Sequence, residues 1–498
     1  MEVIEHLLSF QMIIVLMVGV IGGIVVGALP GLSATMAVAL LIPVTFGMDA
    51  VAGVTMLVAI YTAGVYGGSV SAILIHTPGT PASAATALDG YQMTKKGEGA
   101  KAIGIATISS MIGGAISAVV LLFLAPPLSR VSLAFSAPEY FLIAVFGLTI
   151  IGSLASQSMI KGLMSGVFGL IIGCIGVDGL SATPRFTFGI INLESGISMV
   201  PAMIGLFSLS QVLILSEKNK SQEGSASIKG LTGRVMPGFK EFKNMVPNIF
   251  RSTGIGTFVG ALPGAGGDIA SWVSYNEAKR FSKNPDEFGK GNPQGVAASE
   301  AANNAVTGGA LIPLFTLGIP GSTTTAVLLG GLMIHGLSPG YQLFTENADI
   351  TYAVIYGLIV ANILMGIIGL LGAKYFVKIS RLSHQILIPS IVVLCIVGSF
   401  AIKNSIFDVW VMLLFGIIGY FMRKTGFHPA PLILAFILGP MAERTLRQTI
   451  TMSQGDFLGF FFTRPIALVL VALIILSLLA PMFINWWKRK SLKHVTND

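Results

Sequence analysis

The sequence has few charged residues for its length. Only 10% of its 498 residues are Asp, Glu, Lys or Arg, whereas about a quarter is typical of soluble proteins. A soluble globular protein is therefore excluded. The chain instead contains apolar runs of the length that crosses a bilayer, about 20 residues each, such as Leu8–Ala28, Ala102–Ala125, Thr351–Gly372 and Pro465–Trp486. The sequence predicts an all-α polytopic membrane protein with about 11 or 12 membrane segments, because a transmembrane β-barrel has short alternating segments instead.

Cysteines are scarce and common catalytic motifs are missing. Cys174 and Cys395 both lie in apolar runs, so we expect two buried thiols with no disulfide. The sequence contains no His-Glu-x-x-His and no Gly-x-x-x-x-Gly-Lys-Ser/Thr, which argues against a zinc protease of that type and against ATP hydrolysis at a phosphate-binding loop. "AGGD" at Ala265–Asp268 lacks the first Gly of the intramembrane aspartyl protease motif. We predict no enzyme, no cofactor and no bound metal; an intramembrane enzyme and a channel remain the alternatives.

Basic residues are unevenly distributed among the predicted loops. If the N-terminus lies outside, the outside loops contain only six of the 30 Lys and Arg residues, namely Arg130, Arg185, Lys403, Arg444, Arg447 and Arg464. Cytoplasmic loops are enriched in Lys and Arg, so this orientation places the C-terminal "WWKRKSLKH" in the cytoplasm. The net charge of +8 then belongs to those loops and indicates no nucleic-acid partner. An acidic "MEVIEH" precedes the first apolar run, and no small-residue cleavage site follows it, which predicts a first span rather than a removed signal peptide.

Two short motifs each occur once in each half of the chain. "VGALPG" is found at Val26–Gly31 and Val259–Gly264, and a Pro-Gly break follows a Gly pair at Pro78-Gly79 and at Pro320-Gly321. A Ser/Thr/Ala-rich helix is expected after each break, ending near Asp89-Gly90 or Gly330-Gly331. Such self-similarity indicates an internal repeat. The predicted organisation is a first repeat over 1–216 with its motif core at 19–92, a basic cytoplasmic linker over 217–245, and a second repeat over 246–498 with its motif core at 246–340.

The loop charges predict that the two repeats are inverted. The first motif core ends at the basic loop "MTKKGEGAK", whereas the second ends at "GLSPGYQLFTENADI", which has no Lys or Arg. Equivalent points would therefore lie on opposite faces of the membrane. Inverted-topology repeats with re-entrant or broken helices are typical of secondary transporters, whose binding sites lie at the breaks.

The residues at the breaks predict a binding site for an anion and a cation. Helix starts after Pro-Gly present free N–H groups that bind anions, and "SEAANNAVTGG" places Glu300, Asn303 and Asn304 in a predicted membrane segment. The candidate substrate or cation ligands are Thr77, Pro78, Gly79, Thr80, Ser83, Asn303, Asn304, Gly321, Ser322, Thr323 and Thr324. The candidate structural tips are Gly27, Pro30, Gly31, Gly260, Pro263 and Gly264. Asp89 and Asp268 are cation-ligand candidates, with interfacial caps as the alternative.

No Lys or Arg lies at the predicted breaks. Helix N-termini and a co-bound cation must then offset the charge of an anionic substrate, which predicts cation-coupled symport. The polar side chains at the breaks leave the substrate itself open.

Four stretches resemble the large membrane subunit of tripartite tricarboxylate transporters: "GALPGLSATMAVALLIPVTF", "GGSVSAILIHTPGTPASAATALDGYQM", "GALPGAGGDIASWVSYNEAKR" and "EAANNAVTGGALIPLFTLGIPGSTTTAVLLGGLMIHGLSPG". The resemblance extends over nearly the whole chain. It implies a multi-pass permease of the bacterial inner membrane, for which the distribution of Lys and Arg predicts a periplasmic N-terminus and a cytoplasmic C-terminus. It also implies a small membrane subunit and a periplasmic solute-binding protein as partners, and uptake of organic di- or tricarboxylates such as citrate driven by Na⁺ or H⁺.

Overall fold

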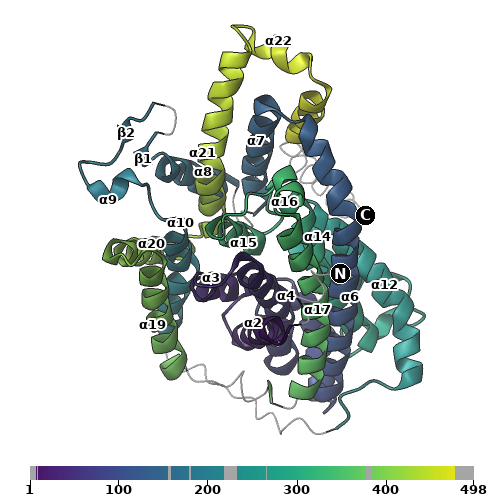
Figure 1. Ribbon diagram of the computed structural model, residues 1–498. Coiled ribbons are helices and arrows are strands. Elements are labelled where there is room, and N and C mark those ends of the chain that lie inside the picture. The colour runs from purple at the N-terminus through teal and green to yellow at the C-terminus, as the bar shows by residue number, and fades with distance from the viewer. Residues whose placement is uncertain are drawn as a thin grey trace, which may run out of the picture. The chain divides into compact units, whose positions relative to one another are not determined.

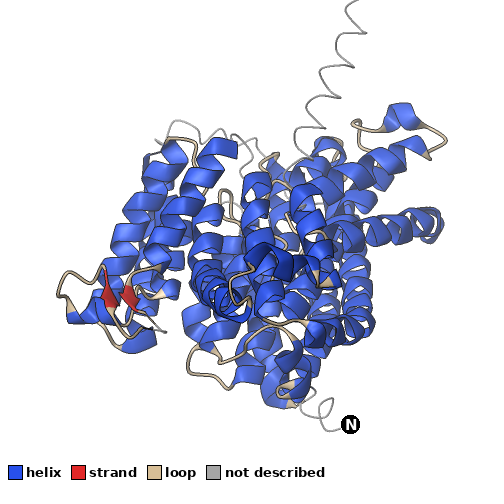
Figure 2. Ribbon diagram, turned by 90° about the horizontal axis from the view of Figure 1, so that it is seen from above, coloured by secondary structure: helices blue, strands red, loops and turns tan. Residues whose placement is uncertain are grey.

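The computed structural model describes residue 7 and the ranges 9–154, 159–178, 181–217, 233–264, 266–373, 375–376 and 384–476. Most of the predicted linker (218–232), the basic C-terminal segment (477–498), residues 1–6 and Ala265 lie outside the described residues. The described chain is almost wholly helical (Figure 2), and its strands are the antiparallel pair β1 (Gly176–Val177) and β2 (Pro184–Arg185). The predicted all-α class is confirmed.

Seven helices of the described chain are long and apolar enough to cross a membrane. They are α2 (Phe10–Ala28), α4 (Ala50–Ile75), α6 (Gly99–Val131) with η1 (Ser132–Ala134), the continuous run of α10 (Met199–Met203), η2 (Ile204–Leu209) and α11 (Ser210–Glu217), α17 (Ala348–Gly372), α19 (His384–Lys403) and α20 (Ile406–Lys424). Five shorter apolar stretches lie in α3 (Ala34–Thr45), α7 (Ala137–Leu154), α8 (Met159–Gly173), α15 (Thr323–Ile334) and 465–476. The polytopic membrane class is confirmed.

The remaining helices include the less apolar partners of these spans. They are α5 (Ser83–Lys95), α9 (Ile191–Glu194), α12 (Phe239–Ala261), α13 (Gly266–Arg280), η4 (Pro285–Glu287), α14 (Pro293–Leu317), α16 (Tyr341–Thr345), α21 (Pro429–Met452) and α22 (Phe457–Phe462). Local chemistry sets where the motif helices begin. The Asp49 carboxylate accepts the Ala52 N–H at the start of α4, and Asn292 caps α14 ahead of Pro293. Asp and Asn are favoured caps, and Pro fits the first helical position.

The chain forms two compact units, and each takes segments from both predicted repeats. The first unit contains residues 1–129 and 198–421, and the second contains 130–197 and 422–498. All the predicted motif residues fall in the first unit. A sequence repeat records duplicated motifs, whereas a compact unit records which helices pack together. The predicted boundaries at 216 and 246 therefore describe the sequence repeat. They do not coincide with the boundaries of the two compact units.

In the first unit, the helix pairs α2–α4 and α12–α14 make matching contacts (Figure 1). A Cβ atom built on Gly23 would lie 2.6 Å from the carbonyl oxygen of Ile60, and one on Gly256 would overlap that of Ala302. Gly23 and Gly256 each lie one turn before the Gly of "GALPG". The same match recurs for Gly67 against Ile24 and for Gly309 against Thr257. These equivalent close approaches support an internal repeat; its inversion across the membrane stays a prediction.

The two halves also cross over in their packing. The helix that follows the first "VGALPG", α3, packs against α15 of the second half, and α13 packs against α5 of the first half. A buried hydrogen bond of 2.8 Å joins Thr35 Oγ1 to Thr324 Oγ1 at the first crossing. At the second, a Cβ atom on Gly267 would lie 3.2 Å from Ala82 Cβ. A helix of each half therefore packs against a motif helix of the other half.

The helices beside the motifs differ in length from simple spans. With 12 residues, α3 is about 18 Å long, well short of a bilayer core of about 30 Å. The apolar run Leu32–Phe46 after the first "GALPG" is itself short for a full span and predicts such a helix. The predicted ends at Asp89-Gly90 and Gly330-Gly331 are wrong, because α5 continues to Lys95 and α15 to Ile334. Gly90 packs closely on Ile73, so that glycine serves helix contact rather than termination.

Apolar and polar side chains are distributed as in a membrane protein. Lipid-facing positions of α2 are apolar and exposed, including Phe10 at 81% and Val18 at 50%. By contrast, 89% of an apolar 18-residue stretch of α4 is buried, and the polar residues Thr62 and Ser69 of this helix are fully buried. In lipid, polar groups must find partners inside the protein. The interior polar residues of α4 thus mark where the helices of the first unit meet.

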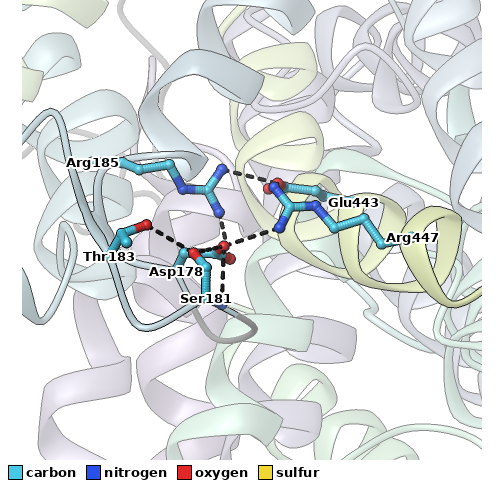
Figure 3. Close-up of polar contacts among 6 residues, drawn as sticks. All are labelled: Asp178, Ser181, Thr183, Arg185, Glu443 and Arg447. Carbon is cyan, nitrogen blue, oxygen red and sulfur yellow. Dashed lines mark hydrogen bonds and ion pairs between the residues drawn. The ribbon is translucent and has the colours of Figure 1, made fainter.

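The second unit is built on α21, which packs against α7 and α8. Its loop after α8 is held by two acids and two arginines that alternate around a ring (Figure 3). Arg185 contacts Asp178 at 2.6 Å and Glu443 at 2.9 Å, and Arg447 contacts the same two carboxylates. The hydrogen bond to Glu443, reinforced by Asp178, raises the pKa of Arg185 above its ordinary value. Ser181 also donates to Asp178 at 2.5 Å. This network fixes the β1–β2 loop to α21.

Candidate functional site

The first Pro-Gly break is packed tightly against the helix that precedes it. α4 ends at Ile75 and is followed by His76 in a left-handed conformation (φ 55°), and α5 begins at Ser83. The Gly79 N–H donates to the Gly68 carbonyl at 3.1 Å. A Cβ atom on Gly79 would lie 2.7 Å from Gly68 Cα and 2.8 Å from the Gly27 carbonyl oxygen. The break and the first "VGALPG" tip therefore meet through bare backbone.

The second break repeats this arrangement. α14 ends at Leu317 and is followed by Gly318 (φ 71°), and the Gly264 N–H donates to the Gly321 carbonyl at 3.0 Å. A Cβ atom on Gly321 would lie 3.0 Å from the Gly260 carbonyl oxygen. The last Gly of each tip has nearly the same positive φ, 84° at Gly31 and 81° at Gly264, a conformation that favours glycine. In both halves the predicted tip touches the predicted break.

Several predicted hydroxyl ligands are engaged in local turns. Ser83 Oγ donates to the Thr80 carbonyl at 2.8 Å. Ser322 caps α15: its Oγ accepts the Thr325 N–H, and Thr325 Oγ1 accepts the Ser322 N–H at 2.8 Å. Such bonds satisfy the backbone at a helix start. In this arrangement these hydroxyls shape the breaks.

The two asparagines lie side by side on α14 but face different helices. Asn304 Nδ2 donates to Thr62 Oγ1 of α4 at 3.1 Å, and Thr62 in turn donates to Asn362 Oδ1 of α17 at 2.9 Å. The Asn304 Oδ1 atom is buried with no hydrogen-bond partner. Asn303 Oδ1 lies 3.1 Å from where Gly267 would carry a Cβ atom. Asn304 thus has an unpartnered amide oxygen beside α4 of the first half, whereas Asn303 lies beside α13 of its own half.

The two predicted aspartates occupy contrasting positions. Asp89 Oδ1 accepts three backbone N–H groups, from Gly289, Gly291 and Asn292, each at 2.8 Å. Its Oδ2 accepts the Tyr275 hydroxyl at 2.8 Å. The loop before α14 therefore satisfies Oδ1, and Tyr275 of α13 binds Oδ2, so Asp89 anchors that loop to α5. Asp268 is exposed in the first turn of α13, where a carboxylate favours the helix N-terminus.

The breaks of both halves lie in one compact unit and differ in their access to solvent or lipid. Thr77 and Pro78 are exposed. The half-buried ligands are Gly79, Thr80, Ser322 and Thr323, and the buried ones are Ser83, Asn303, Asn304, Gly321 and Thr324. Among the tips, Gly27 and Gly260 are buried, Pro30, Pro263 and Gly264 are half-buried, and Gly31 is exposed.

Of the cysteines, Cys395 is buried as expected and Cys174 is partly exposed; both are free thiols.

Comparison with known proteins decides the family. Residues 13–434 match the tripartite tricarboxylate transporter TctA family. The chain belongs to this family. It is 38% identical over 456 residues to an uncharacterised 52.8 kDa protein in the TAR-I ttuC′ 3′ region of Agrobacterium vitis, covering 91% of this chain and 90% of the relative. It is 39% identical over 228 residues to a protein in the TAR-II ttuC′ 3′ region of that organism, covering 45% of this chain and 94% of the relative. No solved structure matches the chain.

Tripartite tricarboxylate transporter membership confirms the resemblance found in the motifs and gives the broad function, the large subunit of a tricarboxylate transporter with partner subunits. Sequence reasoning missed the partners of the α14 residues. Thr62 and Ser69 lie seven residues apart on α4, so they share a face of that helix, and Asn362 is a lone amide in the apolar α17. Isolated polar residues in membrane helices usually face the protein interior, and this signal would have found them.

Proposed function

We propose that this chain is the large permease subunit of a binding-protein-dependent secondary transporter that imports organic carboxylates such as citrate. Uptake is coupled to a sodium or proton gradient by alternating access. The proposal includes a small membrane subunit, a periplasmic solute-binding protein, and an inner-membrane location with the N-terminus periplasmic and the C-terminus cytoplasmic. Family membership supports the transport class. The coupling ion, the substrate and these partners are part of the proposal.

One observation carries the proposal: the matched pair of Pro-Gly breaks, each held against its own "VGALPG" tip. Interrupted helices at equivalent points of a repeat are where transporters place substrate and ion sites. The first turns after the breaks present backbone N–H groups, which suit a carboxylate. No Lys or Arg lies at either break, so a co-transported cation would offset the substrate's charge. Movement of the breaks by rocking or elevator displacement would expose the site to each side in turn.

Asn304 provides the test of the site. In proteoliposomes containing the assembled transporter, Asn304→Leu removes the buried amide that bonds to Thr62 and the unpartnered Oδ1. We expect citrate uptake to fall at least about tenfold, since a polar group placed inside a membrane protein is usually functional. Asn244→Leu, at an exposed position of α12, is the matched control and should leave uptake unchanged. Wild-type uptake by Asn304→Leu would remove this residue from the site.

Side-specific labelling tests the inversion. In a variant without Cys174 and Cys395, single cysteines are introduced as Lys96→Cys and Asn347→Cys, in the loops that end the two motif cores. Inverted repeats predict labelling of the first from the cytoplasmic side and of the second from the periplasmic side. If a membrane-impermeant maleimide labels both from one side, the inverted arrangement is wrong.

Transport kinetics separate the proposed function from a channel. A transporter of this kind gives saturable citrate uptake that requires the binding protein, because the substrate is delivered to a site exposed on one side at a time. Flux that rises linearly with citrate and needs no binding protein would favour the channel. Release of a chemically altered product would favour an intramembrane enzyme.

A further inference from the structure

Glu300 lies at the centre of a cluster of hydroxyl groups inside the first unit. It is fully buried in α14. Its Oε1 atom accepts hydrogen bonds from Ser69 Oγ of α4 at 2.6 Å and from Thr86 Oγ1 of α5 at 2.5 Å. Its Oε2 atom accepts one from Ser110 Oγ of α6 at 3.0 Å. Three helices thus contribute donors to one carboxyl group.

No positive charge offsets Glu300 within the described part of the chain, where the ion pairs involve other carboxylates. The titratable group that interacts with it electrostatically is Tyr66 of α4, whose hydroxyl is hydrogen-bonded to Thr107 Oγ1 at 2.6 Å. The neighbouring elements α5, α6 and α13 present hydroxyl groups, and the carboxylate of Asp89 on α5 is bound to the loop before α14. An ionised Glu300 would be an isolated charge stabilised by hydrogen bonds alone.

This environment favours a proton as the occupant of the cluster. Moving a carboxylate out of water is very costly unless a counter-charge compensates it, and hydroxyl donors recover only part of that cost. The oxygen–oxygen separations of 2.5 to 3.0 Å are those of direct hydrogen bonds. Oε2, with the longer bond to Ser110, is less engaged than Oε1, which accepts two short bonds, and is the oxygen that would carry a proton.

We propose that Glu300 is the proton-binding site of this transporter, holding its proton in the closed arrangement and releasing it to water when the breaks open. Release breaks the O–H bond at Oε2, leaves the electron pair on the carboxylate, and delivers the proton to the side to which the site is open. This inference rests on the proposed function and selects its coupling ion.

Glu300 is placed to link protonation to movement of the first break. Ser69 precedes that break on α4 and Thr86 follows it on α5, so the carboxyl group joins the two helices that flank the break. One turn along α14, Asn303 lies beside Gly267, and its Nδ2 group is buried near Glu300 without a hydrogen bond of ordinary geometry. A change of charge at Glu300 alters the hydrogen bonds that hold the break closed, next to the candidate substrate ligand Asn303.

Glu300→Gln in the assembled transporter tests the proposal, because glutamine imitates the protonated acid and cannot release a proton. For the exchange assay, proteoliposomes are loaded with radiolabelled citrate. For the accumulation assay, the outside is made more acidic than the inside, and the membrane potential is held at zero. One pH unit sustains about a tenfold citrate gradient for each coupled proton. We expect Glu300→Gln to lose this accumulation but to keep citrate exchange within about twofold, since a fixed neutral group permits movement with substrate bound. Glu346→Gln, at an exposed position, is the control and should behave as wild type.

A second readout does not depend on transport. Infrared difference spectroscopy should show a protonated carboxyl band at neutral pH in the wild type that is missing in Glu300→Gln. If the Gln variant does not assemble, Glu300→Asp takes its place: its carboxyl band should shift, and pH-driven accumulation should persist at a lower rate.

The outcomes separate the two proposals. Retained pH-driven accumulation in Glu300→Gln, or wild-type accumulation driven by sodium and insensitive to pH, overturns the assignment of Glu300 and leaves the proposed transport function standing. A wild type that neither exchanges nor accumulates citrate or any other organic di- or tricarboxylate overturns the proposed function. The infrared band then still decides whether Glu300 holds a proton, and its absence from the wild type refutes that.

Discussion

Gly256 offers the sharpest test of the matched helix packing. A Cβ atom on Gly256 would overlap the carbonyl oxygen of Ala302 and lie 2.8 Å from its Cα atom, whereas ordinary contact begins at 3.4 Å. Both obstacles are backbone, so Gly256→Ala must part α12 and α14 by roughly half an ångström or more, which weakens many dispersion contacts along the pair. Overpacking of this kind costs about 1–3 kcal/mol.

Gly254, two residues earlier on the same helix, is the matched control. A Cβ atom there meets nothing within 4 Å. Replacing Gly by Ala in a helix adds about 1 kcal/mol of helix propensity, and this gain is common to both variants. Gly254→Ala should therefore be neutral or stabilising, and Gly256→Ala should be about 1–3 kcal/mol less stable than Gly254→Ala.

The assay is thermal unfolding of the purified variants in one detergent, followed by tryptophan fluorescence and by loss of the monodisperse peak. The repeat predicts that Gly23→Ala, whose Cβ atom would lie 2.6 Å from the Ile60 carbonyl oxygen, is destabilised to a similar degree. Equal melting temperatures for Gly256→Ala and Gly254→Ala would refute the close approach of α12 and α14. A stable Gly23→Ala beside an unstable Gly256→Ala would refute the equivalence of the two helix pairs.

Three further predictions concern polar contacts. Asp178→Asn removes the carboxylate between the two ring arginines and should lower the stability of the loop after α8 by about 1–3 kcal/mol, seen as faster cleavage in limited proteolysis; an unchanged cleavage rate would contradict the ring. Asp89→Asn weakens the acceptor of three backbone N–H groups and should lower the melting temperature clearly, whereas Asp268→Asn at an exposed position should change stability by less than about 0.5 kcal/mol; equal effects would refute the anchor role. Thr35→Val and Thr324→Val should show a coupling of about 1 kcal/mol in a double-mutant cycle, and additive effects would argue against their hydrogen bond.

Local pattern predicted much of the fold. The apolar runs correspond to α2, α6 and α17, and the short run after the first "GALPG" became α3. Gly31 and Gly264 adopt almost the same positive φ, as expected of tips that break a helix. These features depend on residues close in sequence, where chain length, apolar content and Pro-Gly breaks determine the outcome.

Hydrogen-bond partners that are far apart in the sequence could not be predicted by such reasoning. Ser69 and Glu300 are 231 positions apart, and Asp89 gains its loop contacts from positions about 200 residues away (that is, from outside any local sequence pattern). The expected helix ends at Asp89-Gly90 and Gly330-Gly331 failed for a related reason: a helical glycine packed against a neighbouring helix looks, in sequence, like a glycine that ends one. Composition shows that a polar group needs a partner but does not show which helix supplies it.

The crossed packing of α3 with α15 and of α13 with α5 has a consequence for how the protein is made. During synthesis the first half emerges alone, with the polar face of α4 and the start of α3 lacking the partners that the second half provides. α4 is apolar enough to enter the membrane by itself, but the final packing of α3 and α4 requires α14 and α15 to be inserted. Either half produced alone should therefore be unstable. The two halves produced as separate chains in the same membrane should assemble into a stable protein.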